Sequence, residues 1–398
     1  MLAVCSDLDE TPDRGAYWEI VRFLNSTATT AMGPGLGLEV GNTIYFDMPP
    51  GQFSYWNTDD AGREMVRALI RSGHIDCLHS YGDLATTRAH AGRALDELAR
   101  HDCRLEVWID HAIAPTNFGA DIMRGHGDEP GHEAYHADLT CGYGVKYVWR
   151  GRVTSMIGQD VPPSLGGIFT ARHPAASART LAKEAAKRVL ARCGNERYAM
   201  HGPNCVLREV RLRDGRPVIE FLRCDPYWGG VGDGATPQRL SEVLTRPFLD
   251  RLVAREGVCI LYTHLGKVRD RRGILPPAAR DALRLLAEYY HDGWILVTTT
   301  RRLLGYCRAV REVVLRAEDD GRSVDVVIEW PDGADERGGG SRPADLDGLT
   351  WCLPPDRQVR AWWRGRQLED VTINPPDHTG RASASLAWRR LAFPGSKW

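Results

Sequence analysis

The feature that most restricts the fold is an alternation of short apolar runs with longer segments of helical periodicity, which continues to about residue 307. Short apolar runs bounded by turn residues are typical of buried strands. Strands that alternate with helices form parallel sheets, because each helix carries the chain back across the sheet. Seven or eight such units predict an α/β fold with a (β/α)7-type barrel, closed or nearly closed. The expected strands are "LAVCSDLD", "HIDCLHSYG", "LEVWIDHA", "VKYVW", "RYAMHG", "VCILYTHLG" and "WILVTTT".

Four segments between these runs are expected to be helices, namely 59–73, 84–101, 175–194 and 277–293. The first has an aspartate near its start and a glycine at its end, which suits helix capping. A hairpin is expected at "VLREVRLRDGRPVIEFL", because "RDGR" is a favourable turn between two alternating segments.

The pattern changes after about residue 310, where apolar and polar residues alternate between glycine-containing turns. This alternation predicts that a small antiparallel β domain, residues 311–398, follows a barrel domain at 1–307. The C-terminal region also holds six of the chain's 12 tryptophans, which we expect to be core or domain-interface residues rather than a sugar-stacking platform. They are Trp330, Trp351, Trp362, Trp363, Trp388 and Trp398.

Composition excludes several classes of protein. The formal net charge of −1 lacks the basic excess of a nucleic-acid-binding protein. The ten cysteines form no CxxC pair, and most lie in apolar runs, which favours buried reduced thiols. The N-terminus lacks a signal-peptide pattern, and no apolar run approaches the roughly 20 residues that span a bilayer. We therefore expect a cytoplasmic protein without a membrane span; the oligomeric state stays open.

Histidines and aspartates stand where five of the expected strands end. In parallel barrels the active site lies at the carboxyl ends of the strands, so these side chains should meet at one rim. Such groups are costly to bury unless something binds them. The residues are Asp7, Asp9, His79, Asp83, Asp110, His111, His201 and His264.

These residue types suit a divalent metal, most simply zinc. Imidazole nitrogens and carboxylate oxygens are ordinary zinc ligands, and a catalytic site leaves one position for water. A bound metal lowers the pKa of that water, while a separate carboxylate and histidine can act as base and acid.

The segments "SDLDE", "GHIDCLHSYGD", "ILYTHLGK" and "GWILVTTTRRLLGYC" resemble, in order, motifs of the polysaccharide deacetylases. The resemblance covers roughly residues 1–307. It implies membership of the broad superfamily of glycoside hydrolases and deacetylases, which share a (β/α)7-type barrel.

The resemblance also implies roles for individual residues. His79, followed by Ser80, matches the first metal histidine, and Asp9 matches a metal-binding aspartate. Asp7 is then the candidate base. His264 occupies the position of the late histidine that acts as the acid.

Two positions depart from the family pattern. Asp83 stands where the family has its second metal histidine, and it is either a ligand or the cap of the following helix. The third motif, usually an Arg-Pro segment, is replaced by "WIDHAIAPTNFG". His111 within it could supply the missing imidazole, with Asp110 orienting it.

Substrate contacts are expected from the loop at 125–139, because long loops over a barrel mouth commonly touch substrate. Tyr135, His136 and Asp138 are the candidates in this loop. Asp110, Asn117 and His201 complete the expected substrate-binding set.

The favoured function is a metal-dependent hydrolase that removes an N-acyl group from a carbohydrate or glycoconjugate. A glycosidase that uses two carboxylates on the same barrel is one alternative. A non-catalytic carbohydrate-binding or assembly protein is another, from a different class.

Overall fold

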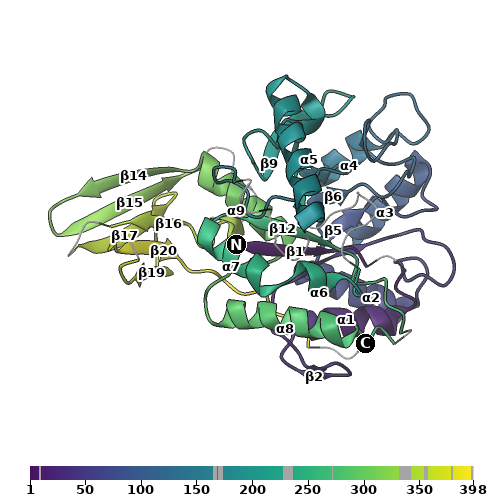
Figure 1. Ribbon diagram of the computed structural model, residues 1–398, viewed down its shortest axis with the longest axis horizontal. Coiled ribbons are helices and arrows are strands. Elements are labelled where there is room, and N and C mark those ends of the chain that lie inside the picture. Colours follow the sequence, from purple (N-terminus) through teal and green to yellow (C-terminus); the bar gives the residue numbers. More distant parts are fainter. Residues whose placement is uncertain are drawn as a thin grey trace. The chain divides into compact units, whose positions relative to one another are not determined.

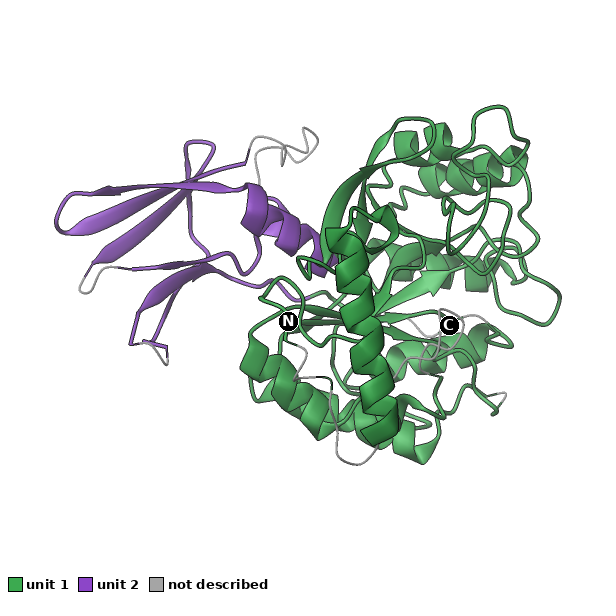
Figure 2. Ribbon diagram, turned by 45° about the horizontal axis from the view of Figure 1, so that its top comes forward, with its two compact units in different colours: residues 1–301, 391–398 green, residues 302–390 purple. Residues whose placement is uncertain are grey.

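A computed structural model describes residues 1–8, 10–164, 168, 174–226, 236–270, 272–330, 342–353, 357–377, 380–395 and 398. Contacts divide the chain into two compact units, coloured separately in Figure 2. Unit 1 comprises Met1–Arg301 and Leu391–Trp398, and unit 2 comprises Arg302–Arg390. The chain therefore leaves unit 1 before the boundary expected from composition, and its last residues return to unit 1 rather than belonging to the C-terminal region.

Unit 1 is built on a sheet whose strands are almost all parallel. Its hydrogen-bonded order is β8-β11-β12-β1-β4-β5-β6-β7-β10-β9, with β13 also paired to β1, and only β9 runs antiparallel to its neighbour. The strands are β1 (Leu2–Ser6), β4 (Gly41–Ile44), β5 (Ile75–His79), β6 (Val107–Ile109), β7 (Tyr147–Trp149), β8 (Val153–Thr154), β9 (Leu207–Arg211), β10 (Pro217–Phe221), β11 (Arg223–Cys224), β12 (Cys259–Thr263) and β13 (Val297–Thr298). A separate small ribbon pairs β2 (Thr29–Thr30) with β3 (Gly33–Pro34).

The connection between β7 and β8 shows that this sheet is curled. Only residues 150–152 separate these two strands in the chain, yet eight positions of the strand order run from β8 to β7. Within this connection the indole of Trp149 donates to the carbonyl of Arg152 at 2.7 Å. Arg152 in turn accepts from the backbone of Arg223 in β11 at 3.0 Å. The sheet thus forms a curled half-barrel, so the strand ends expected at one rim do share an edge.

Helices follow most of the strands, as the alternation predicts (Figure 1). The expected helix at 59–73 is α2, where the side chain of Asp59 accepts from Gly62 N and Gly73 has a positive φ of 80°. The α-helices are α1 (Arg14–Asn25), α2 (Asp60–Arg71), α3 (Arg88–Arg100), α4 (Ala137–Tyr143), α5 (Pro174–Arg192), α6 (Leu240–Val243), α7 (Arg246–Arg255), α8 (Pro277–His291) and α9 (Thr300–Glu312). Among the described residues, no helix has both the length and the apolar character needed to cross a membrane.

Two sequence assignments fare differently. The hairpin is confirmed as β9 and β10, paired antiparallel. The expected strand "RYAMHG" is wrong, because this segment holds the 3₁₀ turn η2 (Glu196–Tyr198) and a further turn. The side chain of Asn195 accepts from Arg197 N at 3.0 Å and caps that turn, which competes with an extended backbone.

The segment Leu391–Trp398 packs into unit 1 beside α1 and β5. The backbone N–H of Leu391 donates to Glu39 at 2.8 Å. The ring of Phe393 stacks on Trp18 at 5.3 Å and meets the edge of His74 at 5.1 Å. Burial lowers the pKa of His74 to about 4, so this histidine is a neutral part of the packing.

Unit 2 consists of small sheets that are mainly antiparallel, although β15 and β17 pair in parallel. Trp330 and Trp363 lie in its apolar core, which confirms the core interpretation for these two tryptophans. Most of the glycine-rich segment "ADERGGGSRPAD", which we expect from its sequence to be a flexible loop, lies outside the described residues. The elements are β14 (Val314–Asp319), β15 (Ser323–Glu329), η4 (Ala344–Leu346), β16 (Thr350–Cys352), β17 (Gln358–Trp363), β18 (Arg366–Leu368), β19 (Val371–Asn374) and β20 (Ser383–Leu386).

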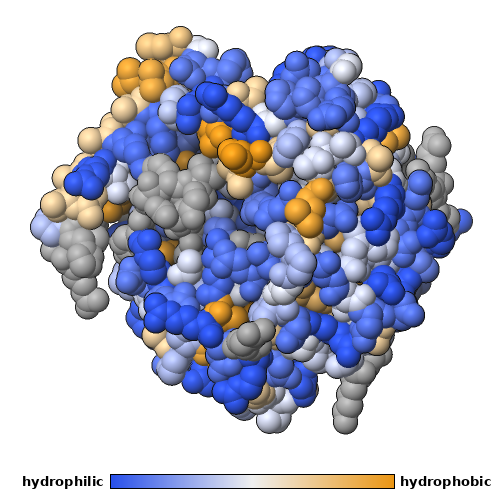
Figure 3. Space-filling model, turned by 90° about the vertical axis from the view of Figure 1, so that its right-hand side faces the viewer, coloured by the Kyte–Doolittle hydropathy of each residue, from blue (hydrophilic) through white to orange (hydrophobic). Residues whose placement is uncertain are grey.

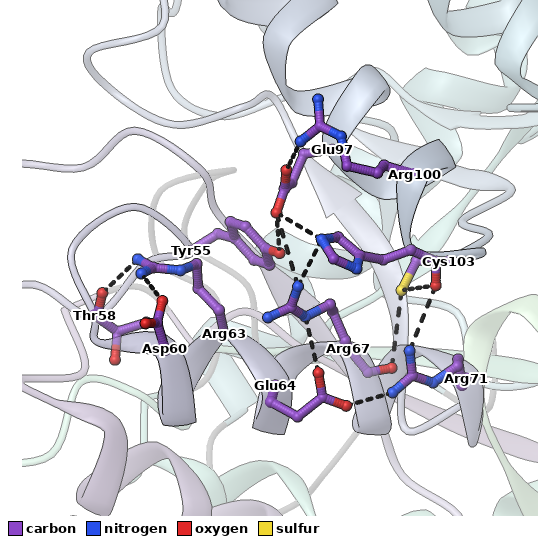
Figure 4. Close-up of polar contacts among 11 residues, drawn as sticks. Tyr55, Thr58, Asp60, Arg63, Glu64, Arg67, Arg71, Glu97, Arg100 and Cys103 are labelled. Carbon is purple, nitrogen blue, oxygen red and sulfur yellow. Dashed lines mark hydrogen bonds and ion pairs between the residues drawn. The ribbon is translucent and has the colours of Figure 1, made fainter.

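A charged network ties α2 to α3 around the buried carboxylate of Glu97 (Figure 4). One of its oxygens accepts from the hydroxyl of Tyr55 at 2.8 Å and lies 3.2 Å from His101 Nε2. The other accepts from Arg100 at 2.5 Å, and Arg67 lies 3.9 Å from the first oxygen. Both oxygens of this carboxylate are therefore engaged by groups from the surrounding elements.

Candidate active site

The carboxyl edge of the curled sheet gathers titratable and aromatic side chains from six neighbouring strands, β11, β12, β1, β4, β5 and β6. β1 runs from the labelled N-terminus toward the right of Figure 1, so Figure 3 views the face to which β1 points. Hydrophilic residues cover most of that face, and apolar residues form small separate patches on it.

An ion pair that is almost completely buried lies at the centre of this edge. Asp7, directly after β1, accepts two hydrogen bonds from Arg223 of β11, at 2.9 and 3.1 Å. Their side chains are 1% and 0% exposed. The guanidinium lies over the rings of Trp149 and Tyr262, at 4.2 and 4.8 Å from their centroids.

This setting keeps Arg223 charged. Burial by itself would lower the pKa of Arg223, but the nearby carboxylate of Asp7 and other negative groups raise it above its usual value. The bidentate pair with Asp7 satisfies both partners in a place where either charge alone would be costly.

His79 ends β5 and lies beside this ion pair. Its ring stacks on Tyr45 at 4.4 Å, and its Nδ1 lies 3.9 Å from Asp7 Oδ1. In the described part of the chain, Nδ1 of this buried ring has no hydrogen-bond partner. Burial, followed by the charges of His111, Arg223 and His264, lowers the pKa of His79 well below its usual value. The ring is therefore neutral, which is the form that binds a metal ion.

His111 approaches His79 from the loop after β6. The two rings lie 4.9 Å apart, edge to face. His111 Nδ1 is 2.8 Å from Asp83 Oδ1, and this hydrogen bond is the main reason why the pKa of Asp83 lies below its usual value. Asp83 is not the cap of the next helix, because α3 has Thr87 as its N-cap.

His264 follows β12 and completes the cluster. It is buried, with Nε2 lying 3.2 Å from the hydroxyl of Tyr262. Its charge is one of those that lower the pKa of His79, which places the two imidazoles within electrostatic reach of each other. Asp9, the expected metal ligand, lies outside the described residues.

Two expected substrate contacts instead hold the loop after β6 in shape. Asp110 is fully buried and accepts from the Trp108 indole at 2.7 Å and from two backbone N–H groups, so it does not orient His111. Burial raises the pKa of Asp110 to about 7. Asn117 accepts from the backbone N–H of His111 at 2.9 Å and donates to its carbonyl at 3.0 Å. Asn117 thus fixes the backbone that presents His111.

The other expected substrate contacts make structural contacts elsewhere. Tyr135 donates to Asp214 at 3.1 Å, and Asp138 accepts two hydrogen bonds from Arg88, at 2.5 and 2.8 Å. Both ring nitrogens of the buried His136 have partners, each at 2.8 Å. His201 is buried against the carbonyl of Val153 at 3.2 Å. No structural observation links these four residues to the cluster, so their contact with substrate stays a prediction.

Sequence reasoning missed Arg223, Tyr45 and Tyr262. The sequence does contain a signal for Arg223. An arginine in the mainly apolar run "VIEFLRC" is as costly to bury as the histidines at the ends of the expected strands. Tyr45 follows β4, which was not among the expected strands. The sequence contains no such signal for Tyr262, since a tyrosine in an apolar strand is common.

The donor set of this edge suits zinc in kind, since it offers imidazoles and carboxylates. Nδ1 of His79 has no hydrogen-bond partner in the described part of the chain, so its lone pair is not taken up by a hydrogen bond there. Within the described residues, however, no three histidine, cysteine or acidic side chains are placed to hold one ion together. The direct bond between Asp83 and His111 is one reason, because it occupies both groups.

No protein-family model, curated protein or solved structure matches this chain.

Proposed function

We propose that the carboxyl edge of unit 1 is the active site of a metal-dependent hydrolase, built on a (β/α)7-type barrel, that removes an N-acyl group from a carbohydrate. One observation carries the proposal. Among the described residues, the buried, neutral His79 has no hydrogen-bond partner for Nδ1, which lies beside Asp7 and His111. Buried polar atoms are rarely left unsatisfied without a functional reason.

His79 and Asp9 would hold the metal, and Asp83 or His111 would complete the set once their mutual bond opens. When bound, zinc would supply a Lewis acid for the amide carbonyl and a more acidic water. Including Asp9 follows the resemblance to the deacetylases.

The residues of the chain would move the protons. Asp7 would accept a proton from the attacking water, while Arg223 holds the carboxylate in place through two hydrogen bonds. His264 would donate a proton to the leaving nitrogen. A C–O bond forms from water and the C–N bond breaks, so an amide and water give a carboxylate and a free amine.

The contact between Asp83 and His111 favours a second candidate, a metal-independent hydrolase. A carboxylate that orients an imidazole is a common arrangement for a general base. The glycosidase alternative, whose candidate carboxylates are Asp7, Asp9 and Asp110, has weaker support, because Asp110 is enclosed by its own loop. A non-catalytic binding protein would show neither metal nor turnover in the test below.

The test compares His79→Ala with His74→Ala, two buried histidines at opposite ends of the same strand. Zinc content of purified protein and acetate release from N-acetylglucosamine oligomers are measured for each. We expect His79→Ala to lose the metal and at least about 100-fold of activity, while His74→Ala keeps both and loses stability. His264→Ala should lower turnover and keep the metal.

Stoichiometric zinc and near-normal activity in His79→Ala would overturn the proposal. Full activity after complete chelation would favour the metal-independent candidate. Neither metal nor acetate release in the unmodified protein would favour the binding protein.

A further inference from the structure

A pocket of about 320 Å³ is lined mainly by residues of α7 and α8 in unit 1. Trp294 lies before β13, at the amino ends of the parallel strands, whereas the candidate site lies at their carboxyl ends. A ligand in this pocket therefore does not compete with a substrate at the other edge. The lining residues are Arg246, Asp250, Val253, Ala254, Glu288, Tyr289, Asp292 and Trp294.

One wall of the pocket presents an aromatic surface to solvent. Trp294 is 66% exposed. Such exposure is unusual for tryptophan, which has the largest side chain of the apolar residues. Val253 and Ala254 extend this apolar wall along α7. A flat indole in a concave site offers a face on which the C–H side of a sugar ring can stack.

The remaining walls are acidic. Three carboxylates, Asp250, Glu288 and Asp292, face one guanidinium, that of Arg246, so the lining has an excess of two negative charges. The guanidinium of Arg246 lies 3.9 Å from the carboxylate of Glu288. Its positive charge therefore offsets part of the negative charge of Glu288 and leaves the other two carboxylates less compensated. An indole face together with surplus negative charge attracts cations.

Two further contacts stiffen this lining. The Tyr289 hydroxyl donates to Asp250, and the guanidinium of Arg246 lies over the Tyr289 ring at 5.6 Å. The groups that face the pocket from α7 and α8 are thus held before any ligand arrives, which lowers the entropic cost of binding.

We propose that this pocket binds a saccharide that carries protonated amino groups. A sugar ring would stack on Trp294, its ammonium group would pair with the carboxylates, and its hydroxyls would donate to them. The inference rests on the proposed function for its choice of ligand, because removal of N-acyl groups from a carbohydrate leaves amino groups of this kind. The pocket would then hold the deacetylated part of a chain outside the active site.

Binding is measured by calorimetry with the full chain and a glucosamine oligomer, at low salt. An N-acetylglucosamine oligomer, a glucose oligomer and an oligolysine of similar length serve as comparisons. We expect the glucosamine oligomer to bind more tightly than all three. Trp294→Ala should weaken its binding about tenfold.

Asp292→Asn should also weaken binding of the glucosamine oligomer, whereas Asp281→Asn on the exposed side of α8 serves as the control and should not. Unchanged binding in Trp294→Ala would overturn the inference. Equal or tighter binding of oligolysine would overturn it as well, because it would show a site for basic peptides.

The readouts separate this inference from the proposed function. His79→Ala should bind the glucosamine oligomer as well as the unmodified protein does. Tight binding at Trp294 without any acetate release would reject the proposed function and keep the pocket. Acetate release without any binding at Trp294 would keep the proposed function and reject the inference about the pocket.

Discussion

The candidate active site and the Glu97 network both hold charged side chains and histidines in protected places, but they differ in how completely the group at their centre is engaged. Tyr55, Arg100 and His101 engage both oxygens of Glu97. At the sheet edge, His79 Nδ1 and Ser80 Oγ are buried without a hydrogen-bond partner in the described residues.

This difference separates two uses of buried polarity. A network that satisfies itself joins structural elements and needs no further partner. A cluster with open atoms costs stability until something binds there. The backbone supports this view of the sheet edge, because Ser80 and Tyr81 both have positive φ, at 45° and 62°, and such strain often accompanies functional sites.

The largest expected effect comes from breaking the buried ion pair. Arg223→Met leaves Asp7 without its two hydrogen bonds in a site that excludes water. We expect a loss of about 3–5 kcal/mol in the free energy of unfolding, measured by urea denaturation. Arg100→Met is the matched control in the Glu97 network. Its side chain is 66% exposed, so the loss should stay below about 1 kcal/mol. Equal losses in the two variants would contradict the comparison.

His136 sharpens the comparison through pH, because it is a buried histidine whose two nitrogens are both satisfied. Burial lowers its pKa to about 4, against about 6.5 in an unfolded chain. Between these values the unfolded chain takes up a proton that the folded chain does not. Stability that is present above pH 6.5 is therefore lost as the pH falls toward 4, by up to about 3 kcal/mol. In His136→Gln, the loss in the free energy of unfolding between pH 6.5 and pH 4 should be smaller by that amount, as measured by urea denaturation at each pH. Parallel curves of this free energy against pH for the two proteins would refute this account.

Replacing the centre of the saturated network should affect folding alone. Glu97→Gln keeps the shape but removes a charge that holds two cations, so we expect a loss of about 1–3 kcal/mol in the free energy of unfolding. Zinc content and turnover should stay within about twofold of the unmodified protein, since this network does not touch the residues proposed to react. A tenfold loss of turnover in a folded variant would show that the network is not merely structural.

The smallest stability effect is expected at Asp83, whose side chain is 40% exposed. Asp83→Asn should change the free energy of unfolding by less than about 1 kcal/mol, yet lower activity because His111 loses its charged partner. Asp60→Asn is the control, since this exposed aspartate of α2 pairs with Arg63 on the same helix, next to the Glu97 network (Figure 4). It should leave activity unchanged, and the proposed role of Asp83 fails if both variants behave alike.

Part of the fold and of the candidate site could be predicted from local sequence pattern. Strand–helix alternation predicted a parallel sheet, and position at the strand ends brought Asp7, His79, His111 and His264 to one edge. These are consequences of local pattern and of the rule that parallel strands end together. The expected barrel, closed or nearly closed, goes further than the curled half-barrel that is seen.

The partners of these residues could not be read from local pattern. Asp7 meets Arg223 across 216 positions of sequence, and only the sheet order brings β1 and β11 to opposite sides of β12. The strand expected at "RYAMHG" failed for the opposite reason, because a short apolar segment resembled a strand while Asn195 stabilised a turn. The hydrogen bonds that Asp110 and His136 make to neighbouring parts of the chain could not be read from composition either.

The return of Leu391–Trp398 to unit 1 makes unit 2 an insertion within the chain of unit 1. The partners of this segment, Trp18, Glu39 and His74, are synthesised long before it. During translation, unit 1 therefore waits with an incomplete surface near α1 until all of unit 2 has left the ribosome. A ribosome-bound chain that ends at Arg390 should be cut by protease near Trp18 more readily than the released protein.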